Sequence, residues 1–245
     1  PSARFHDGKP VTVEDVIFSL EAVKKHDPMY AQYYKNVVKS EKTGPHQVTF
    51  TFDVKGNREL PQILGQMTVL PKHYWDGKDA NGEPRDPGKT TLEAPLGSGP
   101  YKIKEFQAGR SIVYERVKDW WAKDLPVGRG MHNFDTLRFE YFRDRTASFE
   151  AFKSGNLDFF QENSAKEWAT AYDLDSIKAG HMKKEQILDG DPPQMQAFIL
   201  NQRRKQMQDP RVRRALHLAF DFEWANKNLF YDQYARVQNF FGEAD

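Results

Sequence analysis

Cysteine does not occur in this sequence, so none of its 245 residues can form a disulfide or supply a thiolate. The absence excludes a cysteine nucleophile and cysteine-bound zinc, although it leaves the cellular compartment undetermined. Long hydrophobic runs do not occur either. Because a helix needs about 20 predominantly apolar residues in succession to cross a bilayer, no segment of this sequence is predicted to span a membrane.

An excess of one charge is also lacking. The 36 Lys and Arg residues and the 35 Asp and Glu residues nearly cancel, which leaves a formal net charge of +1. Such a balance provides no overall field that would steer nucleic acid or an anionic membrane toward the protein. The basic residues between Arg203 and Arg214 are therefore interpreted as the solvated face of a helix, and no nucleic-acid partner is predicted.

Catalytic patterns are scarce. The seven histidines are scattered, without a His-x-x-x-His or His-Glu-x-x-His pair, so no metal site is predicted. Gly97-Ser98-Gly99 lacks the Gly-x-Ser-x-Gly frame of a nucleophile elbow and is typical of a turn. We therefore predict no catalytic residue and no cofactor. A secreted peptide- or glycan-processing hydrolase is the alternative, and it would need a nucleophile or a spaced pair of carboxylates.

The most informative stretch runs from Arg4 to Lys24. Asp7-Gly8 predicts a tight turn, because glycine accepts a positive φ without a Cβ clash. Thr12 followed three residues later by Asp15 predicts a helix N-cap that forms a capping box. A buried stripe is then predicted from the helical spacing of Val13, Val16, Ile17, Leu20 and Val23.

The rest of the chain mixes short strands and short helices, a pattern that indicates the α/β class. Strands are predicted at 46–54, 101–107, 111–117, 137–141, 157–160, 183–188 and 196–201. Short helices are predicted at 60–66, from 144 or 146 to 155, at 166–172 and at 223–231. A further helix begins at Asp209-Pro210, and its buried stripe would comprise Val212, Ala215, Leu216 and Ala219.

Motifs along nearly the whole chain resemble one family, the peptide/nickel-type (cluster C, family 5) solute-binding proteins of bacterial ABC importers. They lie at 5–16, 97–101, 116–121, 149–158 and 201 with 209–216. The stretches 117–127, 130–135, 162–163 and 219–224 resemble the Yej-type oligopeptide-binding proteins more closely. Since the sequence begins at Pro1 without a methionine or a signal peptide, we expect an internal piece of a longer, processed protein.

The resemblance implies a periplasmic-binding-protein-like fold of two lobes (type II) with an additional small domain, and about half of that protein would lie outside this chain. Residues 1–96 would form the small domain, 97–193 part of the first ligand-binding lobe, and 194–245 the hinge crossing and the start of the second lobe. The resemblance further implies a periplasmic monomer, made with a signal peptide in its precursor. It would capture an oligopeptide and deliver it to a permease in the inner membrane.

Candidate ligand contacts are Glu162, Asn163, Gln194 and Gln196. Glu162 and Asn163 directly follow the predicted strand at 157–160, and in open α/β sheets ligands bind beyond the carboxyl ends of strands. A carboxylate there can accept from a peptide ammonium or N–H group, and an amide can both donate and accept. A pair that only caps its own loop is the alternative. Gln194 and Gln196 enter the hinge-side strand, where the resemblance implies main-chain contacts to a peptide.

Overall fold

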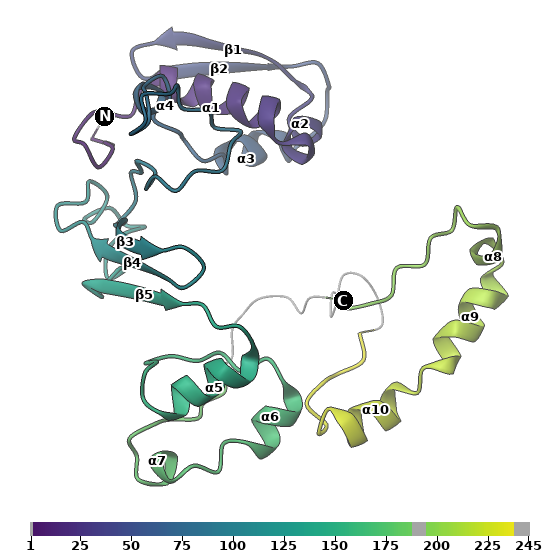
Figure 1. The fold of residues 1–245 in the computed structure, drawn as a ribbon. Coiled ribbons are helices and arrows are strands. Elements are labelled where there is room, and N and C mark those ends of the chain that lie inside the picture. The colour runs from purple at the N-terminus through teal and green to yellow at the C-terminus, as the bar shows by residue number, and fades with distance from the viewer. Residues whose placement is uncertain (1, 188–194, 238–245) are drawn as a thin grey trace. The chain divides into compact units, whose positions relative to one another are not determined.

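The computed structural model describes residues 2–187 and 195–237 (Figure 1). The chain divides into two compact units, Pro1–Ser148 and Phe149–Asp245. The elements of the first unit are α1 (Val13–His26), α2 (Pro28–Tyr33), β1 (Val37–Gly44), β2 (Gln47–Phe52), α3 (Leu60–Gly65), α4 (Lys72–Trp75), β3 (Tyr101–Gln107), β4 (Ser111–Arg116) and β5 (Thr136–Glu140). Helix α5 (Arg145–Lys153) crosses the division, and α6 (Ala165–Thr170), α7 (Asp175–Lys178), α8 (Lys205–Gln208), α9 (Pro210–Ala219) and α10 (Phe222–Leu229) follow.

Helix α1 starts as predicted. Gly8 has a φ of 85°, which confirms the turn before the helix. The Thr12 hydroxyl accepts from the Asp15 backbone N–H at 3.3 Å, and the Asp15 carboxylate accepts from the Thr12 N–H at 2.8 Å. This reciprocal pair confirms the capping box, which satisfies amide groups that have no partner within the helix.

The core of the first unit forms where α1 meets the β1–β2 hairpin and α3. Its buried members are Leu20, Tyr34, Val37, Leu60 and Leu64. Phe50 and Phe52 of β2 pack against this cluster from the half-buried face of their strand. The predicted alternation is therefore confirmed over Gln47–Phe52, where every second side chain of β2 turns toward the core. The strand ends before residue 54, and Val54, predicted on the same face, is exposed.

Strand β1 was not predicted. It pairs antiparallel with β2, with Val37 opposite Phe52 and Ser40 opposite Phe50. The register shifts between Val37 and Lys39 and again between Lys42 and Gly44. Each irregularity changes which face the next side chain occupies, so the strand lacks the strict alternation by which a strand is recognised in a sequence.

Two polar side chains of α1 are buried on its core side, where the sequence predicted only an apolar stripe. Asp15 is 3% exposed and Ser19 is 1% exposed. The Asp15 carboxylate accepts from the Lys72 N–H at 2.8 Å, and the Ser19 hydroxyl accepts from the Leu70 N–H at 2.7 Å. These hydrogen bonds satisfy the buried side chains of Asp15 and Ser19 and hold the chain at 70–72 against the helix.

Strands β3, β4 and β5 form the second antiparallel sheet, in that order. Tyr101 lies opposite Arg116 and Gln107 opposite Ser111, around a turn whose Gly109 has a φ of 72°. The predicted hairpin is confirmed, as is the predicted strand that begins near Leu137. Glycine at this turn permits the left-handed backbone that a short hairpin connection uses.

Residues 3–11 link regions on both sides of residue 96. The His6 N–H donates to the Gly97 carbonyl at 2.8 Å, and the His6 Nε2 lies 2.9 Å from the Gly99 carbonyl oxygen. Arg4 pairs with Asp119 at 3.1 Å. These contacts lie inside the first compact unit, and the division into a small domain and a lobe at residue 96 stays a prediction.

Protonation of Asp7 is expected to weaken the first unit in acid. Burial favours the protonated carboxyl, but hydrogen bonds from the Lys9 N–H at 3.1 Å and from His73 at 2.8 Å, with nearby positive charge, hold the pKa of Asp7 below its ordinary value. Because folding lowers this pKa, the stability that the charged Asp7 contributes is complete above the unfolded-state pKa of about 3.9. It is lost as the pH falls through the folded-state pKa.

Urea unfolding between pH 3 and pH 7 measures this effect when wild type is compared with Asp7→Asn. The gap between the two unfolding midpoints should be constant at the upper end of this range and should close below about pH 4. If the gap between the two midpoints stays constant down to pH 3, the charge of Asp7 contributes nothing to the stability of the fold.

Several strands predicted in the second unit do not form. Residues 157–160, 183–187 and 196–201 are not strands in the structure, and residue 188 lies outside the described part. An extended segment becomes a strand only when a neighbouring chain completes its hydrogen-bond ladder, and the described sheets involve only β1 to β5. The helices predicted at 166–172 and 223–231 are confirmed as α6 and α10.

Helix α9 is confirmed with the predicted cap, because the Asp209 carboxylate accepts from the Arg211 N–H at 2.8 Å. Its predicted buried stripe is wrong for this structure. Val212 is 39% exposed and Leu216 is 46% exposed, and no residue of the helix is buried. Helical spacing identifies an apolar face, but burial also requires another element to cover that face.

Candidate functional site

Glu162 lies in the connection between α5 and α6 and is half-buried. One carboxylate oxygen accepts from the Ser164 N–H at 2.7 Å, and the other accepts from the Tyr172 hydroxyl at 2.8 Å. Ser164 caps α6 by accepting from the Glu167 N–H at 3.2 Å. The carboxylate therefore supports the entry to α6, as the loop-capping alternative predicted.

The strand on which the prediction for Glu162 depended does not form, so its placement at a strand end is wrong. Asn163 is exposed beside it. Gln196 is exposed in the extended stretch after residue 194, and Gln194 lies outside the described residues. A role of these residues in ligand binding stays a prediction.

An aromatic cluster anchors the connection that carries Glu162. Phe152 and Phe160 stack with ring centroids 5.4 Å apart, and Tyr172 lies 5.2 Å from Phe149 and 5.8 Å from Trp168. Phe152 and Tyr172 are buried. No sequence pattern indicates Tyr172 as a partner of Glu162, because the two residues lie ten positions apart in the chain.

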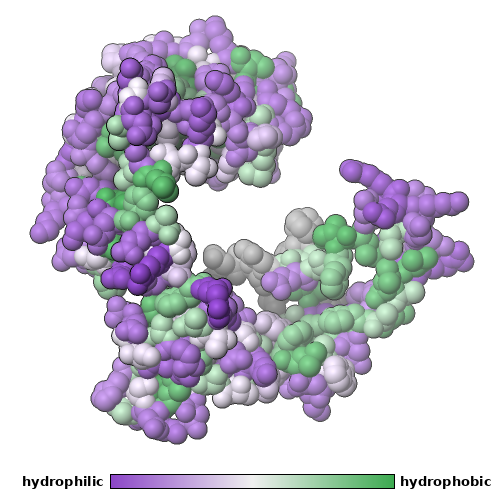
Figure 2. All heavy atoms as spheres, in the orientation of Figure 1, coloured by the Kyte–Doolittle hydropathy of each residue, from purple (hydrophilic) through white to green (hydrophobic). Residues whose placement is uncertain are grey.

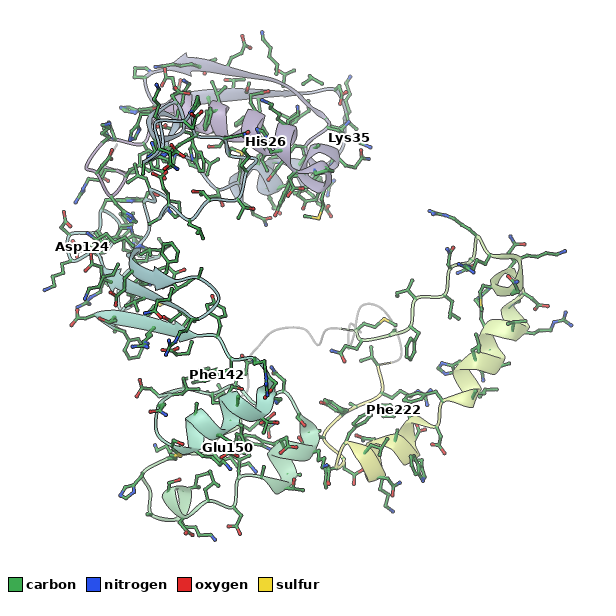
Figure 3. The ribbon with its side chains drawn as sticks, in the orientation of Figure 1. His26, Lys35, Asp124, Phe142, Glu150 and Phe222 are labelled. Carbon is green, nitrogen blue, oxygen red and sulfur yellow. The ribbon has the colours of Figure 1, made fainter. Side chains whose placement is uncertain are left out.

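The cluster extends to charged side chains of the same unit. The Lys184 ammonium lies 4.3 Å from the centre of the Trp168 ring, within the range of a cation–π interaction. On α5, Lys153 pairs with Glu150, which Figure 3 labels, at 2.5 Å. These contacts order the surroundings of Glu162, so its carboxylate has a defined position.

Two tryptophans donate hydrogen bonds to the Gly97-Ser98-Gly99 segment. The indole N–H groups of Trp120 and Trp121 both donate to the Ser98 carbonyl, at 3.0 and 2.9 Å. The carbonyl of Ser98, rather than its hydroxyl, is therefore the atom that organises this turn. Residues 97 and 98 have no regular structure, and the chain bends at 99–100.

The part of the chain that the structure describes holds neither a metal-binding cluster nor a membrane-spanning helix. No group of three His, Asp or Glu side chains there could hold a metal ion. Within the same residues, no helix combines the length and apolar character needed to cross a bilayer. Two of the basic residues between Arg203 and Arg214 form contacts within the chain. Arg211 pairs with Asp209 at 2.7 Å, and Arg213 donates to the Met207 carbonyl at 2.7 Å.

The electrostatics of Asp209 follow from these contacts. The Arg211 side chain and backbone N–H both donate to its carboxylate, and they hold the pKa of Asp209 below its ordinary value. The carboxylate is thus charged at neutral pH at the N-terminus of α9, where negative charge is favourable.

Curated relatives match nearly the whole length of this chain. It is 48% identical over 98% of its length to the probable peptide-binding protein YejA of Agrobacterium fabrum, and it covers 39% of that protein. It is 37% identical over 98% of its length to the peptidoglycan-binding protein YepA of the same organism, and covers 39% of it. The chain therefore spans about two fifths of the length of these curated relatives.

Solved structures share the fold. NikA from Brucella suis, solved in complex with Fe(III)-EDTA, matches with a TM-score of 0.73 and 18% identity, over 99% of this chain and 46% of NikA. The oligopeptide-binding protein AppA from Bacillus subtilis, solved with a nonapeptide, matches with a TM-score of 0.65 and 24% identity, over 96% of this chain and 43% of AppA. These likenesses confirm the predicted fold class.

The family itself is identified by a match over nearly the complete sequence. The model of the bacterial extracellular solute-binding proteins, family 5, matches residues 1–244. Together with the relatives and the shared fold, this match confirms the resemblance that the motifs indicated. The chain belongs to the bacterial extracellular solute-binding proteins of family 5.

Proposed function

We propose that the whole protein is the substrate-binding component of an ABC importer, which captures oligopeptides in the periplasm and delivers them to a permease in the inner membrane. The observation that carries the proposal is the family match over residues 1–244, and the 48% identity to a probable peptide-binding protein supports the choice of peptides. The protein would act as a monomer that binds its ligand without transforming it.

Capture of this kind depends on two lobes that close around the ligand. A ligand shifts an open–closed equilibrium only by the difference between its affinities for the two states, so it must contact both lobes. Residues 97–193 would contribute to the first lobe, and the chain from 194 would enter the second. In this proposal Glu162, Asn163, Gln194 and Gln196 contact the peptide from these segments.

Native mass spectrometry of the full-length protein as purified tests the proposal. A stoichiometric mass increment that corresponds to an intact peptide would support it. Incubation with a peptide mixture, followed by mass spectrometry of the products, tests the hydrolase alternative. Cleaved products that increase with time would overturn capture in favour of catalysis.

Glu162→Ala should weaken peptide binding by about 10- to 100-fold. A hydrogen bond between a charged carboxylate and the ligand contributes roughly 1.5–3 kcal/mol. Asn163→Ala should have a smaller effect, because a neutral hydrogen bond contributes about 0.5–1.5 kcal/mol. Calorimetric titration of the full-length variants with a native ligand measures both changes.

Tyr172→Phe is the matched control for Glu162→Ala. It removes the hydroxyl that donates to the carboxylate at 2.8 Å and leaves the carboxylate in place. Its melting temperature should fall slightly while its affinity stays close to that of wild type. If Glu162→Ala and Tyr172→Phe both lower the melting temperature and neither changes the affinity, Glu162 serves the loop alone.

A further inference from the structure

The loop at 76–95 contains the only asparagine of this sequence that directly precedes a glycine, in the pair Asn81-Gly82. The chain doubles back around this pair. The Asp79 N–H donates to the Glu83 carbonyl at 2.8 Å, and the Gly82 N–H donates to the Asp79 carbonyl at 3.0 Å. Gly82 has a φ of 83°, a backbone conformation that favours glycine. Asn81 and Gly82 therefore form the tip of a tight turn, and both are exposed.

The space around this tip is open. A Cβ built on Gly82 would have no atom within 4 Å apart from its neighbours in the chain. The face of the first unit that Figure 2 shows is mainly hydrophilic, so water wets this surface. Because glycine has no Cβ, nothing crowds its backbone nitrogen. Asn81 thus combines an accessible side-chain amide, an unhindered nitrogen in the next residue and contact with water.

The carboxylate of Asp79 holds the turn together. It accepts from the Glu83 N–H at 2.8 Å, from the Asn81 N–H at 2.9 Å and from the Asn81 side-chain amide at 3.4 Å. These hydrogen bonds, chiefly the one from the Glu83 N–H, hold the pKa of Asp79 below its ordinary value, so the carboxylate is charged at neutral pH. A second carboxylate in place of the Asn81 amide would repel this charge instead of donating to it.

We propose that Asn81 is a site of spontaneous deamidation, which replaces its neutral amide by a carboxylate. The Gly82 nitrogen attacks the Asn81 side-chain carbonyl carbon, and the side-chain nitrogen leaves as ammonia with the proton that the Gly82 nitrogen gives up. Water then opens the cyclic imide at either of its carbonyls, which yields aspartate or isoaspartate. The reaction consumes only water, and asparagine is a thermolabile residue for this reason. The proposal is independent of the ligand that the protein binds.

The turn controls both the rate and the consequence of this reaction. The Gly82 N–H must leave the Asp79 carbonyl before the nitrogen can attack, so the reaction follows local opening of the loop. Either product then places a negative charge beside Asp79, and isoaspartate also lengthens the main chain within the turn. The modified turn should therefore open more readily than the original one.

Peptide mapping by mass spectrometry tests the proposal on the full-length protein, incubated in mildly alkaline buffer. The exchange of amide for carboxylate should be at least about tenfold faster at Asn81 than at Asn57, because the arginine after Asn57 has a Cβ that crowds its nitrogen. Asn57 is a matched control, since it is also exposed and its side-chain oxygen accepts from the Glu59 N–H at 3.0 Å. Equal rates at the two asparagines, or a faster reaction at Asn57, would overturn the proposal.

The role of the turn is tested by repeating the incubation in urea. The reaction at Asn81 should be faster in the unfolded chain, which no longer holds the Gly82 N–H. An equal or slower rate in urea would show that the turn does not restrain the reaction.

Asn81→Asp reproduces one of the two products, and hydrogen exchange measures its effect on the turn. The Gly82 and Glu83 amides should exchange about two- to fivefold faster than in wild type, the effect typical of one exposed charge pair. Asn81→Ser removes the side-chain amide without adding a charge, so its increase should be smaller. Equal exchange in the two variants would show that repulsion from Asp79 plays no part.

Discussion

Asp15→Ala is expected to destabilise the first unit by about 3 kcal/mol, because the substitution leaves three partly buried donors without their acceptor. The carboxylate accepts from the Thr12 N–H at 2.8 Å, the Thr12 hydroxyl at 2.7 Å and the Lys72 N–H at 2.8 Å. Each unsatisfied buried donor costs about 1–3 kcal/mol. The carboxylate half of the capping box and the bond to Lys72 are lost together, whereas the bond from the Leu70 N–H to Ser19 remains.

Urea unfolding monitored by circular dichroism measures the loss, and Glu14→Ala is the matched control. Glu14 occupies the same first turn of α1, but its side chain is exposed and contacts Lys42 at 2.6 Å. Its removal should change the unfolding midpoint far less than removal of Asp15. Similar midpoints for the two variants would mean that α1 is held by its apolar residues alone.

Gly128→Ala is expected to destabilise the turn around the tryptophans by about 3 kcal/mol or more. Gly128 is buried, and a Cβ added there would lie 2.3 Å from the Ala122 carbonyl oxygen and 2.9 Å from the Trp120 ring. The nearer contact is with backbone, so no rotation of a side chain can relieve it. The backbone of residues 122–128 must move instead.

Gly130→Ala is the control for Gly128→Ala, because it removes a glycine from the same region without creating a steric clash. Gly130 has a φ of 78°, and a Cβ there would have no atom within 4 Å. The cost should be limited to the strained backbone, about 1–2 kcal/mol. Thermal unfolding gives both values, and tryptophan fluorescence should shift only for Gly128→Ala. A smaller loss for Gly128→Ala than for Gly130→Ala would contradict the close packing.

The candidate ligand site shows where prediction from sequence stopped. The sequence indicated a polar pair at Glu162 and Asn163, and it left open whether the pair binds a ligand or caps a loop. The hydrogen bonds of Glu162 to Ser164 and Tyr172 demonstrate the cap. They depend on how the aromatic cluster packs, which residue spacing alone does not specify.

The sequence by itself determined the features whose causes are local. The capping box of Thr12 and Asp15, the turns at Gly8 and Gly109, and the start of α9 at Asp209 depend on a few neighbouring residues, so their patterns identify them. The order of the motifs likewise indicated the family. None of these inferences required knowledge of which distant segments meet.

Only the tertiary structure decided the features that depend on a distant partner. Strand β1 exists because β2 supplies its ladder, whereas residues 157–160 remain irregular. Asp15 and Ser19 are buried because the chain at 70–72 brings amide donors to them. A strand and a buried polar group each need hydrogen bonds from elsewhere in the chain, and those bonds form only when the fold brings the partners together.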